Sequence, residues 1–187
     1  ETVREQAALE DVSAVMEGSP CLCTVGRFSH AKGMDRAVRI AARLVEMGMK
    51  GLRWYLAGYG DEASVRREIA AHGMEEHVVI LGKKANPYPY MAACGLYVQP
   101  SRYEGKAVAV REAQILGRPV AITRFPTASG HLEDGVDGVI VPNDEEGAAQ
   151  ALFSLLHDPA RLESLAAACR ARDYGNRDEI LKLEALV

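Results

Sequence analysis

Short apolar runs alternate with amphipathic segments along almost the whole chain. Six continuously apolar runs predict β-strands, at residues 19–25, 52–57, 78–81, 96–99, 120–123 and 138–141. Between them, apolar side chains recur at helical spacing, as in the series Ala37, Ile40, Ala41, Leu44 and Val45. Strict alternation of strands and helices predicts right-handed crossovers and one parallel sheet covered by helices.

The same pattern sets the expected helices. They span residues 34–47, 61–73, 86–91, 108–116, 148–156 and 161–169, and the last segment, 176–186, is expected to be helical too. Gly48, Gly73 and Gly117 stand where three of these helices end. Strands that are short and apolar at consecutive positions suit a sheet buried on both faces. We therefore predict an α/β fold, a Rossmann-like doubly wound parallel sheet of about six strands flanked by helices.

The first 18 residues differ from the rest because they are rich in charge. Leu9, Val12 and Met16 have rough helical spacing, and Gly18-Ser19-Pro20 marks the end of the segment. Residues 1–18 are therefore predicted to be a linker or a leading helix. The remaining residues, 19–187, are long enough for one domain with a sizeable core.

Composition excludes several classes of protein. The net charge of −4 argues against a general nucleic-acid binder. No apolar run reaches membrane-spanning length, and no secretory signal stands at the start of the sequence. The four cysteines contain no C-x-x-C pair and have no partners at metal-ligand spacing, so we expect buried free thiols and no metal site.

Candidate chemistry lies in the loops after the predicted strands. Ligands of such sheets bind at the carboxyl ends of the strands, and these loops hold most of the glycines and many basic residues. Glu104 and Glu112 are spaced E-x7-E, with Gly105 directly after the first acid. A strand, a loop and a helix N-terminus form a cradle for phosphate, because free backbone N–H groups and the helix dipole both favour an anion. This arrangement suits a nucleotide diphosphate sugar.

Six signals occur in a recognisable order. They are Val25-Gly26-Arg27 with Lys32-Gly33, then Gly58-Tyr59-Gly60, Leu81-Gly82, Pro100 to Gly105 with Glu112, Gly117-Arg118-Pro119-Val120, and Asp134 to Pro142. This order resembles the C-terminal domain of glycosyltransferase family 4, whose members are retaining enzymes with the two-domain GT-B fold. The resemblance covers residues 19–187, and the segment Tyr103 to Gly117 is most similar to bacterial capsular or exopolysaccharide transferases.

The resemblance implies roles for individual residues. Arg27 and Lys32 would bind the donor diphosphate and offset charge on the departing nucleotide, and Glu104 would contact the donor sugar near its anomeric centre; these three are the predicted catalytic residues. Glu112 would accept hydrogen bonds from the ribose. The predicted donor-binding set also contains Gly26, Lys83 beside the base, Gly105, Lys106 as a further cation, and the backbone amides of Ala107 and Val108.

The chain departs from the family pattern at one point. Many members have E-G-F-G-x-P before the second acid, where this chain has Lys106-Ala107-Val108. Sugar contacts made by the usual side chains are therefore not carried over. Simpler alternatives stay open for each residue: solvated basic side chains, a Glu112 paired with a neighbouring cation, and a Glu104 placed by the helix dipole.

The resemblance implies a hexosyltransferase that moves a sugar from a nucleotide diphosphate donor to an acceptor hydroxyl, in polysaccharide or cell-surface glycan synthesis. No metal or other cofactor is expected, because Arg27 and Lys32 would supply the positive charge. The acceptor, a glycan or a lipid-linked sugar, would bind to an N-terminal domain outside these 187 residues, so this chain alone is expected to bind nucleotide weakly and transfer little. We expect a cytoplasmic protein, peripheral to the inner face of the membrane when full-length.

Two alternatives stay open. One is a sugar-nucleotide epimerase-like or phosphorylase-like GT-B fragment, and the E-x7-E spacing together with the V-G-R and K-G signals argues against it. The other is a nucleotide-binding or interaction module that kept the fold and lost the chemistry, since fold alone never settles function.

Overall fold

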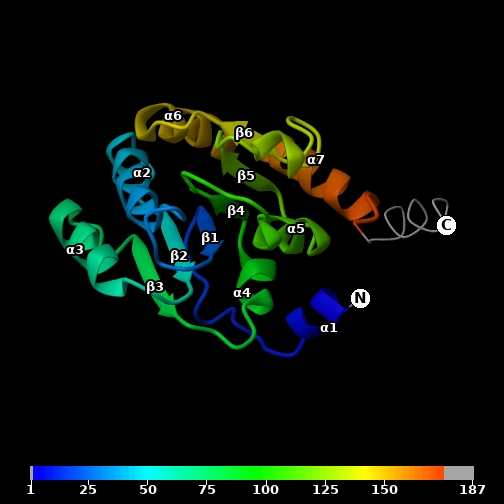
Figure 1. The fold of residues 1–187 in the computed structure, drawn as a ribbon, viewed down its shortest axis with the longest axis horizontal. Coiled ribbons are helices and arrows are strands. Elements are labelled where there is room, and N and C mark those ends of the chain that lie inside the picture. The colour runs from blue at the N-terminus through cyan, green and yellow to red at the C-terminus, as the bar shows by residue number, and fades with distance from the viewer. Residues whose placement is uncertain (1, 175–187) are drawn as a thin grey trace.

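A computed structural model describes residues 2–174, and its centre is a six-stranded sheet in the order β3-β2-β1-β4-β5-β6 (Figure 1). The strands are β1 (Cys21–Val25), β2 (Arg53–Ala57), β3 (Val78–Gly82), β4 (Leu96–Gln99), β5 (Val120–Thr123) and β6 (Val139–Val141). Every neighbouring pair is parallel. The predicted α/β fold with a doubly wound parallel sheet is therefore confirmed.

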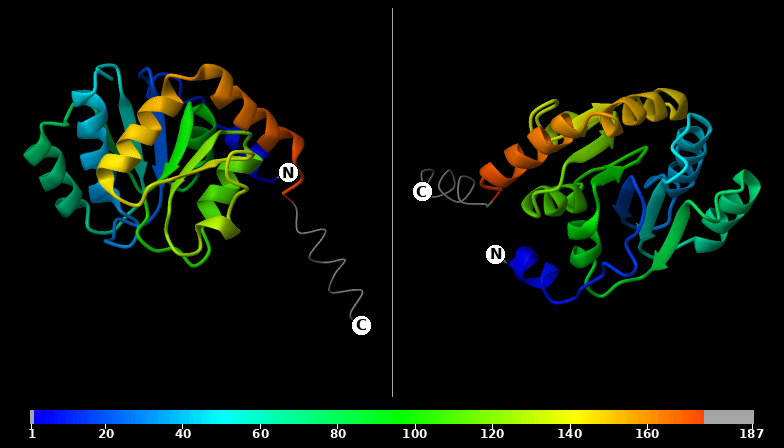
Figure 2. Two further views of the ribbon diagram at one scale, coloured as in Figure 1. Left: turned by 90° about the horizontal axis from the view of Figure 1, so that it is seen from above. Right: turned by 180° about the vertical axis from the view of Figure 1, so that it is seen from behind.

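Helices cover both faces of the sheet (Figure 2). They are α1 (Thr2–Ala7), α2 (Met34–Glu46), α3 (Glu62–His72), α4 (Tyr88–Ala93), α5 (Val108–Ile115), α6 (Glu145–Leu156) and α7 (Pro159–Ala171), with a short 3-10 helix at Ala128–Gly130. Side chains of α2, α3 and α6 pack in one apolar cluster, and those of α4 and α5 pack in a second cluster. The parallel sheet separates the two clusters.

Two helices begin earlier than the apolar pattern predicts. Helix α6 begins at Glu145 because the Asp144 carboxylate accepts a hydrogen bond from the Gly147 N–H, and α7 begins at Pro159 because Asp158 caps it in the same way. Apolar periodicity marks only where a helix touches the core, so it misses a polar first turn.

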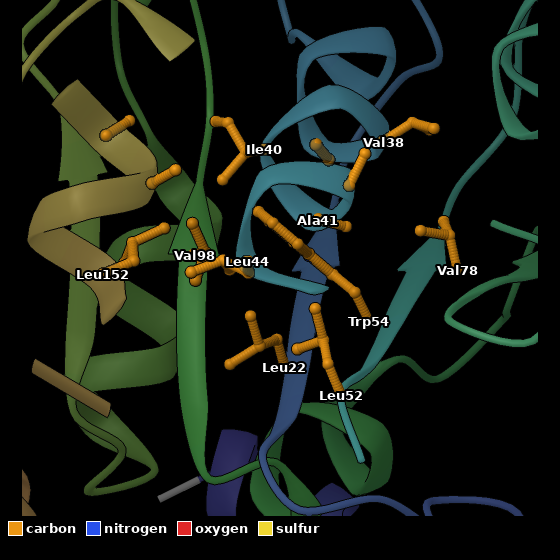
Figure 3. Packing of buried hydrophobic residues seen from close by; sticks show 14 of the residues in the cluster. Leu22, Val38, Ile40, Ala41, Leu44, Leu52, Trp54, Val78, Val98 and Leu152 are labelled. Carbon is orange, nitrogen blue, oxygen red and sulfur yellow. The ribbon is translucent and has the colours of Figure 1, made fainter. Parts of the chain in front are cut away.

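The larger core cluster lies between β1, β2 and α2 (Figure 3). Leu22, Leu44 and Leu52 are fully buried there, and Trp54 is buried with its indole N–H donating to Thr24 Oγ1 at 3.0 Å. All residues of β4 and of β5 are buried, as their apolar runs predict. The polar residues that end these strands, Gln99 and Thr123, are buried with hydrogen-bond partners.

The cysteines match the expectation of free thiols. Cys23, Cys94 and Cys169 are buried and free, whereas Cys21 is partly exposed. Burial raises the pKa of the Cys94 thiol to about 12, so this sulfur stays protonated and unreactive at neutral pH.

The N-terminal segment is helical only over Thr2–Ala7. The spacing of Leu9, Val12 and Met16 does not correspond to a helix, because Leu9 lies outside α1 with 77% of its surface exposed while Val12 is buried in the second cluster. A turn closes there instead, with the Met16 N–H donating to the Val12 carbonyl at 2.9 Å. The predicted helix over 176–186 lies outside the described residues.

Candidate functional site

The loops after the strands join into one surface at the carboxyl edge of the sheet. The Phe28 N–H donates to the Tyr59 carbonyl at 2.7 Å, which ties the loop after β1 to the loop after β2. The Arg102 N–H donates to the Ala31 carbonyl at 2.8 Å, which ties the loop after β1 to the loop after β4. Most of the predicted site residues lie on these loops, so the backbone holds them in one region.

Two glycines allow these loops to approach each other closely. Gly33 has a φ of 69°, and a Cβ placed on it would lie 2.1 Å from the Pro100 carbonyl oxygen. A Cβ on Gly58, whose φ is 154°, would lie 1.7 Å from the carbonyl oxygen of Gly26. The Gly26 N–H donates in turn to the Ala57 carbonyl at 3.0 Å. Any side chain at Gly33 or Gly58 would force the loops apart.

Lys32 and Glu104 meet although 72 residues separate them in sequence. The Lys32 Nζ lies 2.7 Å from both carboxylate oxygens of Glu104. Ser101 Oγ also donates to Glu104 Oε1 at 2.6 Å, and only 4% of the Glu104 side chain is exposed. The Lys32 side chain keeps 29% exposure, so the cation faces outward and the acid lies beneath it.

Arg27 contacts a different partner. Its Nη2 lies 3.4 Å from the Tyr59 hydroxyl, and its guanidinium carbon lies 5.5 Å from the centre of the Tyr59 ring. The Nζ of Lys83, from the loop after β3, lies 5.4 Å from the same ring centre. The structure therefore brings Arg27 and Lys83 together around Tyr59, while Lys32 pairs with Glu104.

The loop before α5 presents backbone N–H groups. Gly105 and Lys106 are exposed, and within residues 2–174 no hydrogen-bond acceptor faces the N–H groups of Gly105, Lys106 and Ala107. The Val108 N–H donates to the Lys106 carbonyl at 3.0 Å. Of the two amides predicted to meet a phosphate, that of Val108 is engaged within the loop. That of Ala107 has no hydrogen-bond partner within residues 2–174, but Ala107 itself is buried.

Within the part of the chain that the structure describes, Glu112 is held by a tyrosine and forms no ion pair. The Tyr88 hydroxyl, on α4, donates to Glu112 Oε1 at 2.8 Å. Burial and the neighbouring carboxylate raise the pKa of Tyr88 to about 12, so the phenol remains a donor at neutral pH. Tyr88 was absent from the predicted site. Its position in the short helix just before β4 is the only sequence signal that places it near the E-x7-E segment.

The loop after β5 contacts the backbone of Glu104. Thr127 Oγ1 donates to the Glu104 carbonyl at 2.6 Å and lies 3.4 Å from Nε2 of His131. Burial lowers the pKa of His131, which keeps its ring neutral near pH 7. Thr127 was not among the predicted site residues, because a side-chain contact to a distant backbone carbonyl leaves no pattern in the sequence.

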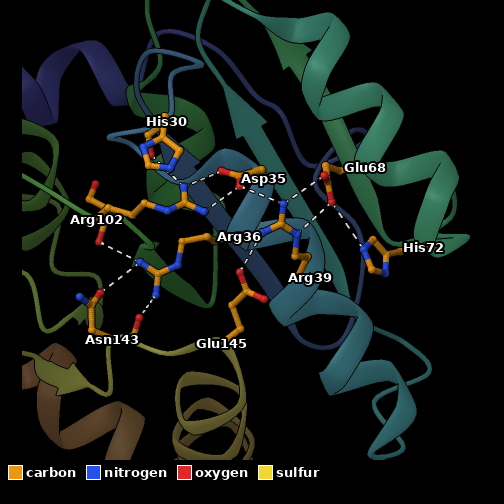
Figure 4. A network of polar contacts seen from close by, with 10 residues as sticks. His30, Asp35, Arg36, Arg39, Glu68, His72, Arg102, Asn143 and Glu145 are labelled. Atoms are coloured by element: carbon orange, nitrogen blue, oxygen red, sulfur yellow. Dashed lines mark hydrogen bonds and ion pairs between the residues drawn. The ribbon is translucent and has the colours of Figure 1, made fainter.

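A network of arginines supports the same loops from the side (Figure 4). The Arg102 guanidinium binds both oxygens of Asp35, at 2.8 and 2.7 Å. Arg36, which is 3% exposed, donates to the Ser101 carbonyl and to the side chain and carbonyl of Asn143. Arg36 thus connects the loops after β4 and β6 from beneath, next to the residue that hydrogen-bonds to Glu104.

The surface has a definite chemical character. It combines exposed cations, the peptide N–H groups of the exposed Gly105 and Lys106, and the carboxylate of Glu112, whose Oε2 has no hydrogen-bond partner among the described residues. Such a surface suits an anionic ligand that also carries hydroxyl groups. Across residues 2–174, no three His, Cys, Asp or Glu side chains are grouped to hold a metal ion. In the same part of the chain, no helix has both the length and the apolar character needed to cross a bilayer.

Comparisons with known proteins find glycosyltransferases. Alpha-D-kanosaminyltransferase of Streptomyces kanamyceticus is 30% identical over 168 residues, which is 88% of this chain and 42% of that protein. The lipopolysaccharide core biosynthesis glycosyltransferase LpsE of Rhizobium meliloti (strain 1021) is 28% identical over 142 residues, covering 75% of this chain and 40% of that protein. The chain therefore spans about two fifths of the length of these relatives.

Solved structures share the fold. A mutant of TarM from S. aureus, in complex with Fondaparinux, alpha-GlcNAc-glycerol and UDP, superposes with a TM-score of 0.82 at 19% identity, covering 95% of this chain and 37% of that one. This sheet with its helices matches glycosyltransferases of the GT-B type. The family model of the glycosyl transferases group 1 matches residues 19–158. Since that is more than half of the chain, this protein belongs to the glycosyl transferases group 1 family.

Proposed function

We propose that this chain is the donor-binding domain of a retaining, family 4 glycosyltransferase that moves a sugar from a nucleotide diphosphate to an acceptor hydroxyl. The observation that carries the proposal is the carboxyl edge of the sheet, where Arg27, Lys83 and the open N–H groups of the loop before α5 share one surface with the Lys32–Glu104 pair. Membership of the glycosyl transferases group 1 family supports the same reading.

The cations are expected to act on the leaving group. As the bond from the sugar to the diphosphate breaks, negative charge grows on the diphosphate, and positive groups already fixed nearby stabilise that transition state more than the ground state. Glu104 neutralises much of the charge of Lys32, because their side chains are in direct contact. Lys83, expected beside the base, lies with Arg27 around Tyr59. We therefore propose that Arg27, Lys83 and Lys106 supply most of the net positive charge and that no metal ion is needed.

Glu112 is proposed to bind the ribose. Its Oε1 accepts a hydrogen bond from Tyr88, which fixes the orientation of the carboxylate. The second oxygen remains an acceptor, and a carboxylate can accept from two adjacent hydroxyl groups. Glu104 has less freedom, because it is buried beneath Lys32. We propose that Glu104 orients Lys32 and that Lys32 lies between its carboxylate and the donor sugar.

The rest of the enzyme lies outside this chain in the proposal. The relatives are more than twice as long as the matched region, so a second domain would supply the acceptor site. We propose that the acceptor is a glycan or a lipid-linked sugar and that a hexose is transferred to it in polysaccharide or cell-surface glycan synthesis. We also propose that the full protein works in the bacterial cytoplasm, at the inner face of the membrane. LpsE, one of the relatives, is named for lipopolysaccharide core biosynthesis.

The test is calorimetric titration of this chain with UDP, GDP and ADP up to millimolar concentration, together with uridine. Arg27→Ala should weaken the binding of the preferred nucleoside diphosphate at least about tenfold, because one charge-assisted contact is lost. Arg66→Ala is the matched control, since Arg66 is an exposed arginine on α3 whose one ion pair within residues 2–174 is with Glu62. Glu112→Ala should instead weaken binding of the nucleoside itself.

Lys32 needs a variant of its own. Lys32→Ala alone would leave the buried Glu104 carboxylate without its cation, which costs about 3–5 kcal/mol of stability. The double variant Lys32→Met with Glu104→Gln removes both charges and keeps the fold testable. Failure of the parent chain to bind any of the three diphosphates would overturn the proposal and favour a non-catalytic module. Unchanged binding in both the Arg27 and the Glu112 variants would show that the site is misplaced.

A further inference from the structure

Tyr59 is a half-exposed aromatic ring that stands between two cations from different loops. Its side chain belongs to the loop after β2, and the residue is 51% exposed. The guanidinium carbon of Arg27 lies 5.5 Å from the ring centre and the Nζ of Lys83 lies 5.4 Å from it. Both distances are within the range of cation–π attraction.

The backbone beneath the ring is tied to the loop that carries Arg27. The Phe28 N–H donates to the Tyr59 carbonyl at 2.7 Å, and the Asp61 N–H donates to the Phe28 carbonyl at 2.9 Å. A Cβ on Gly60, the residue after Tyr59, would lie 2.5 Å from the Phe28 carbonyl oxygen, so the two segments are in close contact. The backbone of Tyr59 is therefore held beside the segment that carries Arg27.

The way in which Tyr59 holds its cations differs from the way in which Lys32 is held. Lys32 is fixed by the carboxylate of Glu104, which also cancels its charge. Within residues 2–174, neither Arg27 nor Lys83 forms an ion pair with a carboxylate. An aromatic ring restricts a long basic side chain and leaves its full positive charge for a ligand, because the ring carries no net charge.

We propose that Tyr59 is a positioning residue for donor binding, which holds Arg27 and Lys83 toward the diphosphate without neutralising them. This inference rests on the proposed function of the site. The ring itself does not contact the ligand in this proposal. The competing idea is that Tyr59 is a stacking surface for the nucleotide base, and the experiment below separates the two.

The binding experiment compares Tyr59→Leu and Tyr59→Phe with the parent chain, using the nucleoside diphosphate that the parent prefers, its monophosphate and its nucleoside. Tyr59→Leu should weaken diphosphate binding about 3- to 10-fold, as expected for two exposed cation–π contacts, and should leave nucleoside binding unchanged. Tyr59→Phe keeps the ring and should lose at most about threefold. Leu9→Ala is the control, because Leu9 is an apolar residue that is 77% exposed and lies outside the loops of the site.

Two further comparisons isolate the cations. In an Arg27→Ala background, Tyr59→Leu should have a smaller effect on diphosphate affinity than in the parent, because part of its action passes through Arg27. Without any ligand, the hydrogen bond from Arg27 and the positive charges of Arg27 and Lys83 lower the pKa of the Tyr59 phenol. The difference in ultraviolet titration between the parent and Tyr59→Phe reports this group, and Arg27→Ala should move its pKa upward.

Four results of these experiments would contradict the proposed role of Tyr59. Equal loss of nucleoside and diphosphate binding in Tyr59→Leu would make the ring a base platform and overturn the proposal. A phenol pKa that Arg27→Ala leaves unchanged would overturn it as well, since the contact would be absent in solution. Parent-like diphosphate binding by Tyr59→Leu would overturn this inference and leave the proposed function intact. A parent chain that binds no nucleoside diphosphate would overturn both.

Discussion

Replacing Gly33 by alanine tests whether the close approach of Gly33 to Pro100 holds the loops of the site together. Gly33 adjoins Lys32 and has a left-handed backbone, with a φ of 69°. A Cβ at this position would lie 2.1 Å from the Pro100 carbonyl oxygen, whereas ordinary contact begins near 3.4 Å. Gly33→Ala must therefore separate the loops after β1 and β4 by about 1.3 Å, the difference between these distances. That separation would also pull Lys32 away from Glu104.

The expected cost has two parts. An alanine in the left-handed region costs about 1–2 kcal/mol, and forcing packed backbone apart adds about 1–3 kcal/mol. Gly73→Ala isolates the first part, because Gly73 has a φ of 62° and nothing lies within 4 Å of a Cβ placed there. We therefore expect Gly33→Ala to lower the free energy of unfolding by about 2–5 kcal/mol and Gly73→Ala by about 1–2 kcal/mol.

Urea denaturation followed by circular dichroism measures both variants, and calorimetry measures their nucleotide affinity. For a domain of this size, about 2–5 kcal/mol corresponds to a fall in Tm of about 4–20 °C. Gly33→Ala should also weaken diphosphate binding at least about tenfold, because the loop that carries both predicted cations moves. Gly73→Ala should bind as the parent does. Equal stability and equal affinity in the two variants would refute the argument that loop contact at Gly33 builds the site.

Three further predictions follow from other contacts. Tyr88→Phe removes the donor to Glu112 and should lower the free energy of unfolding by about 1 kcal/mol at neutral pH. Because the pKa of Tyr88 is raised to about 12, the parent should lose stability relative to this variant as pH rises above 10. A difference in unfolding free energy that stays constant in urea titrations from pH 8 to 11 would contradict this. Burial lowers the pKa of His131, so the parent should lose stability as pH falls below 6.5 while His131→Gln loses less, which thermal melts from pH 7.5 to 5.5 would check. Leu22→Ala should cost about 3–5 kcal/mol in urea unfolding, against less than about 0.5 kcal/mol for the exposed Leu9→Ala, and similar values for both would place the core elsewhere.

The fold could be predicted from the sequence because local patterns encode it. The apolar residues of β4 are all buried, as their run predicts, and the helical spacing from Ala37 to Val45 matches the buried side of α2. Such patterns depend on neighbours a few residues away. The same patterns predicted that the candidate loops lie together at the carboxyl edge of the sheet, because all strands of a parallel sheet point the same way.

The same reasoning failed where a polar or long-range contact decides the structure. The caps Asp144 and Asp158 start their helices before the apolar pattern begins. The first segment has a helix-like spacing at Leu9 and Val12, yet only Val12 reaches the core. A local side-chain cap decided where the two helices begin, and burial against distant elements decided the position of Val12.

The sequence by itself determined the order of strands and helices and the group of loops that carries the candidate chemistry. Only the tertiary structure decided how that chemistry is arranged: Lys32 is neutralised by Glu104, whereas Arg27 rests against Tyr59 and keeps its charge. The physical reason is that side-chain partners depend on how closely loops approach. That approach is set by backbone contacts such as the one between Gly33 and Pro100, which no local pattern reveals.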